Sequence, residues 1–214
     1  MPGIGHLIAG FRRFRYRYFS EDRTLYDRLL KGQSPKVMVI ACSDSRVDPA
    51  ILLDCEPGDL FTVRNVANLV PPCDADGHHH GTSAAIEFAV KSIGIEHIVV
   101  MGHTHCAGIR ALLQGLGDKK DDLQFVSRWV EIAAEARDHV LEHAADSSEE
   151  EQLHLCEEEA ILVSLTNLMS FPWLKKKVEA GELFLHGWYF NLEAGEILAW
   201  NPDTGLFELL GKGA

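Results

Sequence analysis

Short apolar runs and longer helical repeats alternate along the middle of the chain. Val37–Ala41 and His97–Met101 are largely apolar runs that predict buried strands, and Leu60–Arg64 is a third strand candidate. Between them, Ser83–Ile93 repeats apolar residues at helical spacing and ends at Gly94, a frequent helix stop. Strands that alternate with helices predict crossover connections and a mainly parallel sheet.

The second half of the chain predicts long helices followed by two more strands. Residues 122–141 carry apolar side chains on one helical face, and residues 148–170 form a second helical pattern that ends before a proline. Leu183–Tyr189 and Ile197–Trp200 are separated by a short segment with a glycine, which predicts a hairpin and an antiparallel edge strand. We therefore expect one α/β domain over residues 1–214, with a central, mainly parallel β-sheet flanked by helices.

Composition excludes several classes of protein. The 214 residues are 46% hydrophobic and 24% charged, which is typical of a globular chain. No apolar run approaches the ~18–20 residues of a membrane span, and the N-terminus lacks the pattern of a secretory signal. The net charge of −12 disfavours non-specific binding to nucleic acid or anionic membranes. We predict a cytoplasmic protein that binds neither.

The uneven distribution of charge singles out the N-terminal segment. Residues 1–36 hold eight Lys or Arg and three Asp or Glu, a net charge of +5, whereas the remainder carries −17. The basic residues alternate with aromatic ones between Phe11 and Phe19, as in an amphipathic helix. An arm that binds nucleic acid or a membrane is one interpretation. We favour an N-terminal helical arm over residues 1–30 that packs on a partner subunit, because the acidic remainder has the opposite charge.

Two clusters of metal-binding residue types directly follow predicted strands. The first strand is followed by Cys-Ser-Asp-Ser-Arg, and the third by Gly-His-Thr-His-Cys. Because sites gather at the carboxyl ends of parallel strands, we expect Cys42, His103 and Cys106 to meet there. Thiolate and neutral imidazole are preferred zinc ligands, and three protein ligands leave a fourth position open, as in catalytic sites. His105 is the alternative imidazole, but it lies next to Cys106, a tighter spacing for a shared ion.

Asp44 and Arg46, within the first cluster, form a second candidate feature. Arginine stays charged and can hold a carboxylate with two parallel hydrogen bonds. A carboxylate held in this way stays ionised and presents its free lone pairs in a fixed direction, so Asp44 could orient a hydroxide beside the metal. Alternatively, Asp44 could bind the zinc itself and block it, or the two residues could be a structural ion pair at a helix start.

Other cysteines and histidines have simpler interpretations. Five cysteines, an odd number at irregular spacing, argue against a disulfide framework. We predict that Cys55, Cys73 and Cys156 are free thiols. His78–His80 could form a second metal site or a proton relay, but an exposed loop is the simpler interpretation.

Taken together, these motifs resemble those of the β-class carbonic anhydrases. The resemblance extends from about Asp27 to Leu209 and is carried by Cys42–Val47, Val63–Pro72, Gly81–Glu87, Gly102–Cys106 and Glu157–Asn167. It implies one Zn²⁺ held by Cys42, His103 and Cys106, and reversible hydration of CO2 to bicarbonate and a proton by attack of a zinc-bound hydroxide. It also implies that Asp44 orients the hydroxide and that Arg46 holds Asp44. Members of the family form homodimers or dimer-based higher oligomers, which we expect here.

The resemblance also separates two branches of the family. In the plant-like branch, the substrate pocket is formed at positions that match Gln33, Phe61, Val66, Phe88 and Gly102. The other branch closes its zinc with the Asp and binds bicarbonate at a regulatory site made of a Trp, an Arg and a Tyr. This chain keeps Arg64 but has Val39 and Phe190 at the other two positions. We therefore expect an open, plant-like site without that regulation.

Two further functions stay open on the sequence. Hydrolysis of a CO2 analogue, such as carbonyl sulfide or carbon disulfide, would use the same scaffold. A non-enzymatic zinc-binding module would need a fourth protein ligand and would not need the Asp44–Arg46 pair. One departure from the family is Ala107: this chain has Cys106-Ala-Gly where the family usually has Cys-Gly-Gly. Because alanine is the smallest possible change, we expect the turn to form.

Overall fold

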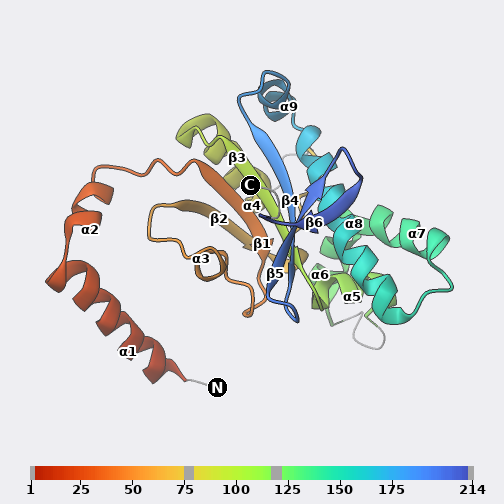
Figure 1. Cartoon of the computed structure of the whole chain (residues 1–214), viewed down its shortest axis with the longest axis horizontal. Helices are drawn as coiled ribbons and strands as arrows, with labels where there is room; N and C mark the ends of the chain where they lie inside the picture. Colours follow the sequence, from red (N-terminus) through yellow and green to blue (C-terminus); the bar gives the residue numbers. More distant parts are fainter. Residues whose placement is uncertain (1–2, 75–79, 117–121, 212–214) are drawn as a thin grey trace. The chain divides into compact units, whose positions relative to one another are not determined.

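The computed structural model of the chain describes residues 3–74, 80–116 and 122–211 (Figure 1). The chain divides into two compact units, Met1–Ser34 and Pro35–Ala214. The smaller unit contains the predicted N-terminal helical arm. A single domain over residues 1–214 stays a prediction.

The N-terminal unit contains two helices that pack through aromatic rings. Helix α1 spans Ile4–Arg15 and continues through a π-helical turn, Tyr16–Glu21, before the short helix α2, Thr24–Leu29. The rings of Phe14 and Tyr26 form a T-shaped pair, with their centroids 5.7 Å apart. These contacts hold α2 against the end of α1, because aromatic pairs at this separation attract each other.

Helix α1 has an apolar face that the unit does not cover. Ile4, Leu7, Ile8 and Phe11 follow helical spacing and are all exposed, Ile4 to 74%. Arginines gather in the last turn of the helix, where they interact favourably with the partial negative charge of the helix C-terminus. The structure thus confirms an amphipathic, basic N-terminal helix.

The larger unit is built on a six-stranded sheet in the order β2-β1-β3-β4-β5-β6. The first four strands of that order are parallel, and β5 and β6 add two antiparallel strands at one edge. The predicted parallel sheet with an antiparallel edge is therefore confirmed, and β6 is an additional strand. The strands are β1 Val37–Cys42, β2 Leu60–Asn65, β3 His97–His103, β4 Phe184–Asn191, β5 Glu196–Asn201 and β6 Leu206–Leu209.

Helices flank this sheet. Figure 1 shows α5 to α8 grouped beside it, and α8 contacts both β3 and β4. None of the described helices is long and apolar enough to cross a bilayer. The helices are α3 Pro49–Leu52, α4 Gly81–Phe88 with a π-helical turn Ala89–Ile93, α5 Ala107–Gln114, α6 Gln124–Val130, α7 Ala134–His143, α8 Glu149–Met169 and α9 Pro172–Glu179.

Helix ends agree with the local sequence in most places. Gly94 has a φ of 78°, a left-handed conformation that glycine adopts easily, and it ends the predicted helix. Ser148 and Glu151 form a reciprocal capping box at the start of α8. The predicted helix over residues 122–141 is instead two helices, because a 3₁₀ turn at Glu131–Ala133 separates α6 from α7. Pro172 begins α9, as well as following the end of α8.

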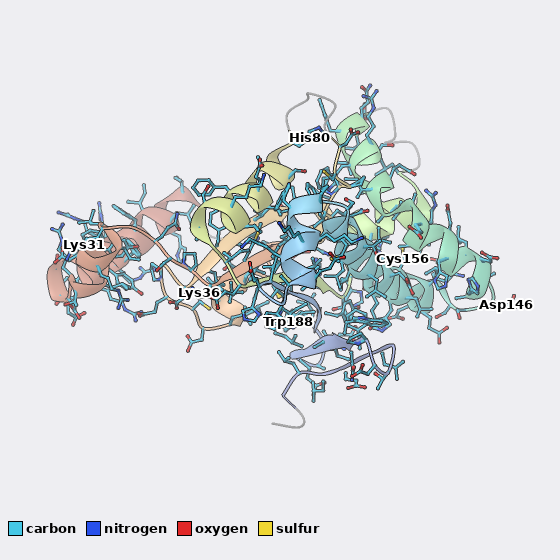
Figure 2. All side chains as sticks on the ribbon, turned by 90° about the horizontal axis from the view of Figure 1, so that it is seen from above. Lys31, Lys36, His80, Asp146, Cys156 and Trp188 are labelled. Carbon is cyan, nitrogen blue, oxygen red and sulfur yellow. The ribbon has the colours of Figure 1, made fainter. Side chains whose placement is uncertain are left out.

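Two clusters of buried side chains position the site. One lies between the sheet and helices α4, α8 and α9, and includes Ile40, Ile161 and Tyr189. The second surrounds the carboxyl ends of β1 and β3, and includes Cys42 and Cys106 among aliphatic side chains of α5 to α8. In Figure 2, Cys156 of this second cluster is labelled on α8, and Trp188 on β4. The candidate ligands are therefore part of a packed core.

Candidate metal centre

Cys42, His103 and Cys106 come together at the carboxyl ends of two adjacent strands. Cys42 is the last residue of β1, His103 is the last of β3, and Cys106 directly precedes α5. Their ligand atoms all lie within 4.8 Å of one another, and the Sγ atoms of the two cysteines are 3.9 Å apart. All three side chains are buried. Within the described residues, this is the one group of three or more such side chains able to hold a metal ion.

The imidazole of His103 is prepared for a metal. Its Nδ1 lies 2.8 Å from the carbonyl oxygen of Thr104, which can only accept, so Nδ1 carries the proton. Nε2 is then a bare lone pair. In the described part of the chain, it is the single buried side-chain nitrogen or oxygen without a hydrogen-bond partner. Buried polar atoms are rarely left unpaired, so two thiols and an unpaired imidazole nitrogen fit a zinc ion.

The two thiols interact strongly in the protein without metal. A hydrogen bond from Cys106 lowers the pKa of Cys42, and the same contact together with burial raises the pKa of Cys106 well above its ordinary value. Burial lowers the pKa of His103, but the neighbouring Cys42 thiolate outweighs burial and raises it overall.

Asp44 is held by Arg46 through two parallel hydrogen bonds. Arg46 Nε donates to Asp44 Oδ1 at 2.9 Å, and Arg46 Nη2 donates to Oδ2 at 2.7 Å. The backbone N–H of Arg46 also donates to Oδ1, at 2.9 Å. The guanidinium of Arg46 holds the pKa of Asp44 well below its usual range, so the carboxylate is ionised. Asp44 does not belong to the group of candidate ligands.

Arg64, on β2, fixes the backbone that carries Cys42 and Asp44. Its Nε donates to the Cys42 carbonyl at 2.9 Å and its Nη2 donates to the Asp44 carbonyl at 2.6 Å. Its Nη1 pairs with Asp48 at 2.8 Å. The sequence indicated Arg64 only as the retained residue of the regulatory site found in the other branch of the family. The register of Ala41 opposite Arg64 on neighbouring strands explains why it reaches this loop.

Comparison with known proteins identifies the family of this chain. The carbonic anhydrase family model matches residues 37–197. A carbonic anhydrase of Synechocystis sp. is 38% identical over 91% of this chain and 70% of its own length. The β-carbonic anhydrase CcaA has a solved structure with a TM-score of 0.90 and 36% identity, covering 96% of this chain and 98% of its own. The chain belongs to the β-class carbonic anhydrases.

A further β-carbonic anhydrase structure is similar at lower identity. It comes from a study titled as describing two tetrameric β-carbonic anhydrases from Sordaria macrospora. It has a TM-score of 0.72 and 28% identity, and covers 91% of this chain and 92% of its own. The fold is therefore shared with this structure over most of both chains.

His105, the other histidine of the segment after β3, contacts Glu193 and not the candidate ligands. His105 Nε2 lies 2.8 Å from Glu193 Oε1, and His105 is outside the group of candidate ligands. The structure therefore selects His103 as the imidazole. His105 has a φ of 58°, a left-handed conformation that is unusual for a residue other than glycine. Its carbonyl oxygen accepts a hydrogen bond from Arg46 Nη2 at 3.1 Å.

Three of the predicted substrate positions present apolar side chains. The rings of Phe61 and Phe88 lie 6.2 Å apart, and Phe88 is 51% exposed. Val66 is partly exposed and lines an apolar pocket of about 360 Å³ together with Phe125 and Trp129. Trp129 Nε1 donates to the Val66 carbonyl oxygen at 2.7 Å, which fixes the chain at that point.

Gly102 and Gln33 have different surroundings from these three. A Cβ atom on Gly102 would lie 2.8 Å from Cδ1 of Ile161, so glycine lets α8 approach β3 closely. Gly102 thus has a packing function whatever else it does. Gln33 belongs to the unit Met1–Ser34, and its function in a substrate pocket stays a prediction.

The remaining predictions concern cysteines and the turn at Ala107. Cys55, Cys73 and Cys156 are all free, as expected. Ala107 is exposed and begins α5, so its methyl group is accommodated and the predicted turn forms. His78 and His79 lie outside the described residues.

Two residues behind the candidate ligands were not recognised from the sequence as site residues. Glu157, on α8, accepts a hydrogen bond from the backbone N–H of Cys106 at 2.7 Å. Tyr189, on β4, donates to the other carboxylate oxygen of Glu157 at 2.7 Å. The contact between Glu157 and Cys106 joins residues 51 positions apart, so no local spacing could have indicated it.

Proposed function

We propose that this chain catalyses the reversible hydration of CO2 to bicarbonate and a proton, with one zinc ion held by Cys42, His103 and Cys106. The observation that carries the proposal is the bare, buried Nε2 of His103 beside two buried thiols. Membership of the β-class carbonic anhydrases supports the same reaction. The absence of a fourth side chain in that group, within the described residues, favours a catalytic over a structural zinc site.

When bound, zinc lowers the pKa of water toward ~7 and makes hydroxide available at neutral pH. The side chains around it then have separate functions. The ionised carboxylate of Asp44 accepts a hydrogen bond from the attacking hydroxyl and so directs the oxygen lone pair at CO2. Arg46 keeps Asp44 ionised and fixed, through the two parallel hydrogen bonds that join them. Arg64 holds the backbone on which Asp44 sits.

The open, plant-like form of the site is part of this proposal. Support comes from the clamp on Asp44, because both of its carboxylate oxygens are engaged by Arg46 and not by the candidate ligands. Phe61 and Phe88 supply apolar surface suited to CO2, a molecule without a net dipole. Gln33 supplies an amide that can donate to a substrate oxygen.

We also propose that the chain acts as a homodimer or a dimer-based higher oligomer in the cytoplasm. The exposed apolar face of α1, with Ile4, Leu7, Ile8 and Phe11, supports an arm that packs on a second subunit. The Sordaria macrospora relatives are described as tetrameric, which agrees with this proposal. Light scattering that finds a fully active monomer would contradict it.

Zinc quantification with stopped-flow CO2 hydration tests the reaction. The wild-type chain should contain one zinc per subunit and hydrate CO2, and Asp44→Asn should keep its zinc while losing activity about 10²-fold. The matched control is Asp138→Asn, on α7, where the carboxylate is 66% exposed and pairs with Arg137. Unchanged hydration by Asp44→Asn would contradict the function given to Asp44. Faster hydrolysis of carbonyl sulfide than hydration of CO2 would assign the scaffold to the analogue.

A further inference from the structure

A buried carboxylate behind the metal group carries an inference that rests on the function proposed for that group. Glu157 is 3% exposed, yet both of its carboxylate oxygens have partners. Oε1 accepts from the backbone N–H of Cys106, and Oε2 accepts from the hydroxyl of Tyr189. Taking a carboxylate out of water costs free energy unless its oxygens are hydrogen bonded. Burial raises the pKa of Glu157, and the hydrogen bonds from Tyr189 and Cys106 offset part of that effect.

The hydrogen bonds around Glu157 have a defined direction. A carboxylate only accepts, so the single proton of the Tyr189 hydroxyl is used toward Glu157. The hydroxyl oxygen is then an acceptor for Nδ1–H of His154, at 2.9 Å. A pocket of about 460 Å³ is lined by Glu157, Tyr189 and His154. Tyr189 is fully buried at its base, whereas the His154 side chain is 47% exposed. The network thus extends from the Cys106 amide to a partly exposed histidine, and each member restricts the next.

The turn that carries Cys106 needs support from outside. His105 adopts a left-handed conformation, which costs free energy for a residue with a Cβ atom. Cys106 precedes the first residue of α5, and no side chain caps that helix. The carbonyl of His105 and the N–H of Cys106 belong to one peptide group, so Arg46 and Glu157 hold that peptide group from its two sides. A carboxylate is also favoured at a helix N-terminus by the helix dipole.

We propose that Glu157 is a positioning residue for the metal centre: through the Cys106 amide it fixes the Cys106 thiolate in the place required for zinc. Tyr189 and His154 hold the carboxylate in that orientation. Glu157 acts through the backbone and touches neither metal nor substrate. Partners of this kind in other metal sites contribute strongly to affinity although they bind no metal themselves.

Zinc affinity, measured by competition with a chromophoric chelator, tests this positioning function. Glu157→Ala removes both acceptors and should weaken zinc binding about 10- to 100-fold. Glu157→Gln keeps an oxygen for the Cys106 amide, so its affinity should lie closer to wild type than to Glu157→Ala. Tyr189→Phe deletes one hydroxyl and should give a smaller loss, and it keeps the test decisive if Glu157→Ala does not fold.

The matched control is Glu159→Ala, because Glu159 lies on the same helix and faces His139. This variant should bind zinc as the wild type does. Cobalt substitution adds a second readout, since a displaced Cys106 thiolate changes the thiolate-to-cobalt absorption band, whereas a general loss of stability does not.

Two results would overturn the positioning function alone. One is wild-type zinc affinity and an unchanged cobalt spectrum in Glu157→Ala, or in Tyr189→Phe where the alanine variant does not fold. The other is an equal loss of affinity in Glu159→Ala. A wild-type chain that binds no zinc would instead overturn both this inference and the proposed function.

Discussion

The segments at the ends of β1 and β3 both supply candidate ligands, but the groups that bind the backbone of Cys42 and of Cys106 have opposite charge. Arginines support the first: Arg64 donates to the carbonyls of Cys42 and Asp44, and it is 27% exposed. A buried carboxylate supports the second, because Glu157 accepts from the Cys106 amide. Under the proposed function, the first segment must remain open to solvent and substrate at Asp44. The second belongs to the packed core and is fixed by buried hydrogen bonds.

This difference shows how one centre combines a fixed ligand set with an accessible reactive side. Arginine can stay partly hydrated while it binds two or three acceptors, so it suits the accessible segment. A buried carboxylate is stable only when each oxygen is paired, and it then restricts its partners closely. Variants on each side of the centre test this contrast.

Removal of the imidazole should have the largest effect. His103→Ala deletes the bare Nε2 nitrogen, leaving two thiols as candidate ligands. We expect zinc content to fall to background and CO2 hydration to fall to the rate of buffer alone. Atomic absorption and stopped-flow assays measure both, and His105→Ala, outside the ligand group, is the control that should retain its zinc. Stoichiometric zinc in His103→Ala would show that this side chain is not a ligand.

Loss of the arginine on the accessible side should come next. Arg64→Ala leaves two carbonyls and the Asp48 carboxylate without their partner. We expect a decrease of about 2 kcal/mol in the free energy of unfolding, with a larger loss of kcat than of zinc affinity. Urea unfolding and steady-state kinetics provide the measurements, with the exposed Arg110→Ala on α5 as the control. An equal loss of zinc affinity in Arg64→Ala and Glu157→Ala would remove the contrast between the two segments.

Close packing behind β3 should give a moderate effect. A Cβ on Gly102 would approach Ile161 to 2.8 Å, so Gly102→Ala should lower the free energy of unfolding by about 1–3 kcal/mol. Gly81→Ala is the matched control, because open space surrounds that position. Thermal unfolding compares the two variants. If Gly102→Ala instead raises KM with unchanged stability, substrate contact and not packing is the function of Gly102.

The smallest effect is expected for Glu158, the residue next to Glu157, and it concerns how stability depends on pH. Burial, with the charges of Glu159 and Glu157, raises the pKa of Glu158 to about 7. A raised carboxyl pKa means that the folded state binds the proton more tightly, so wild-type stability falls as pH rises from ~4.3, the unfolded value, through 7.

Glu158→Gln avoids that loss of stability. Its free energy of unfolding should exceed that of wild type by about 1–2 kcal/mol at pH 8, and the difference should vanish near pH 4. Urea unfolding at both pH values checks the sign. A variant that is less stable than wild type at pH 8 would mean that the ionised Glu158 has a favourable partner in the folded protein.

The candidate ligands were predictable from the sequence because their chemistry is local. Cysteine and histidine follow strands recognisable from apolar runs, and parallel strands bring their carboxyl ends to one edge. Asp44 and Arg46 are two residues apart, so their pairing could also be anticipated. The strand Leu206–Leu209 was missed because it is short and lies at an edge, where one neighbouring strand provides its register.

The residues that support the ligands were not predictable in this way. The Arg64 contacts depend on strand register, and the Glu157 contact depends on where α8 crosses the sheet. That crossing is set by close packing of Ile161 on Gly102 and Gly187, at separations that only glycine allows. Such approach distances are a property of assembled elements and have no signature in a local pattern.

The sequence by itself determined the class of fold, the ligand types and the clamp on Asp44, because periodicity and residue chemistry act over a few positions. The tertiary structure alone decided that Nε2 of His103 is the free nitrogen and that His105 pairs with Glu193. It also decided that a buried glutamate holds Cys106. These choices depend on which groups from distant segments are brought within hydrogen-bonding distance, and the packing of α8 on the sheet determines that.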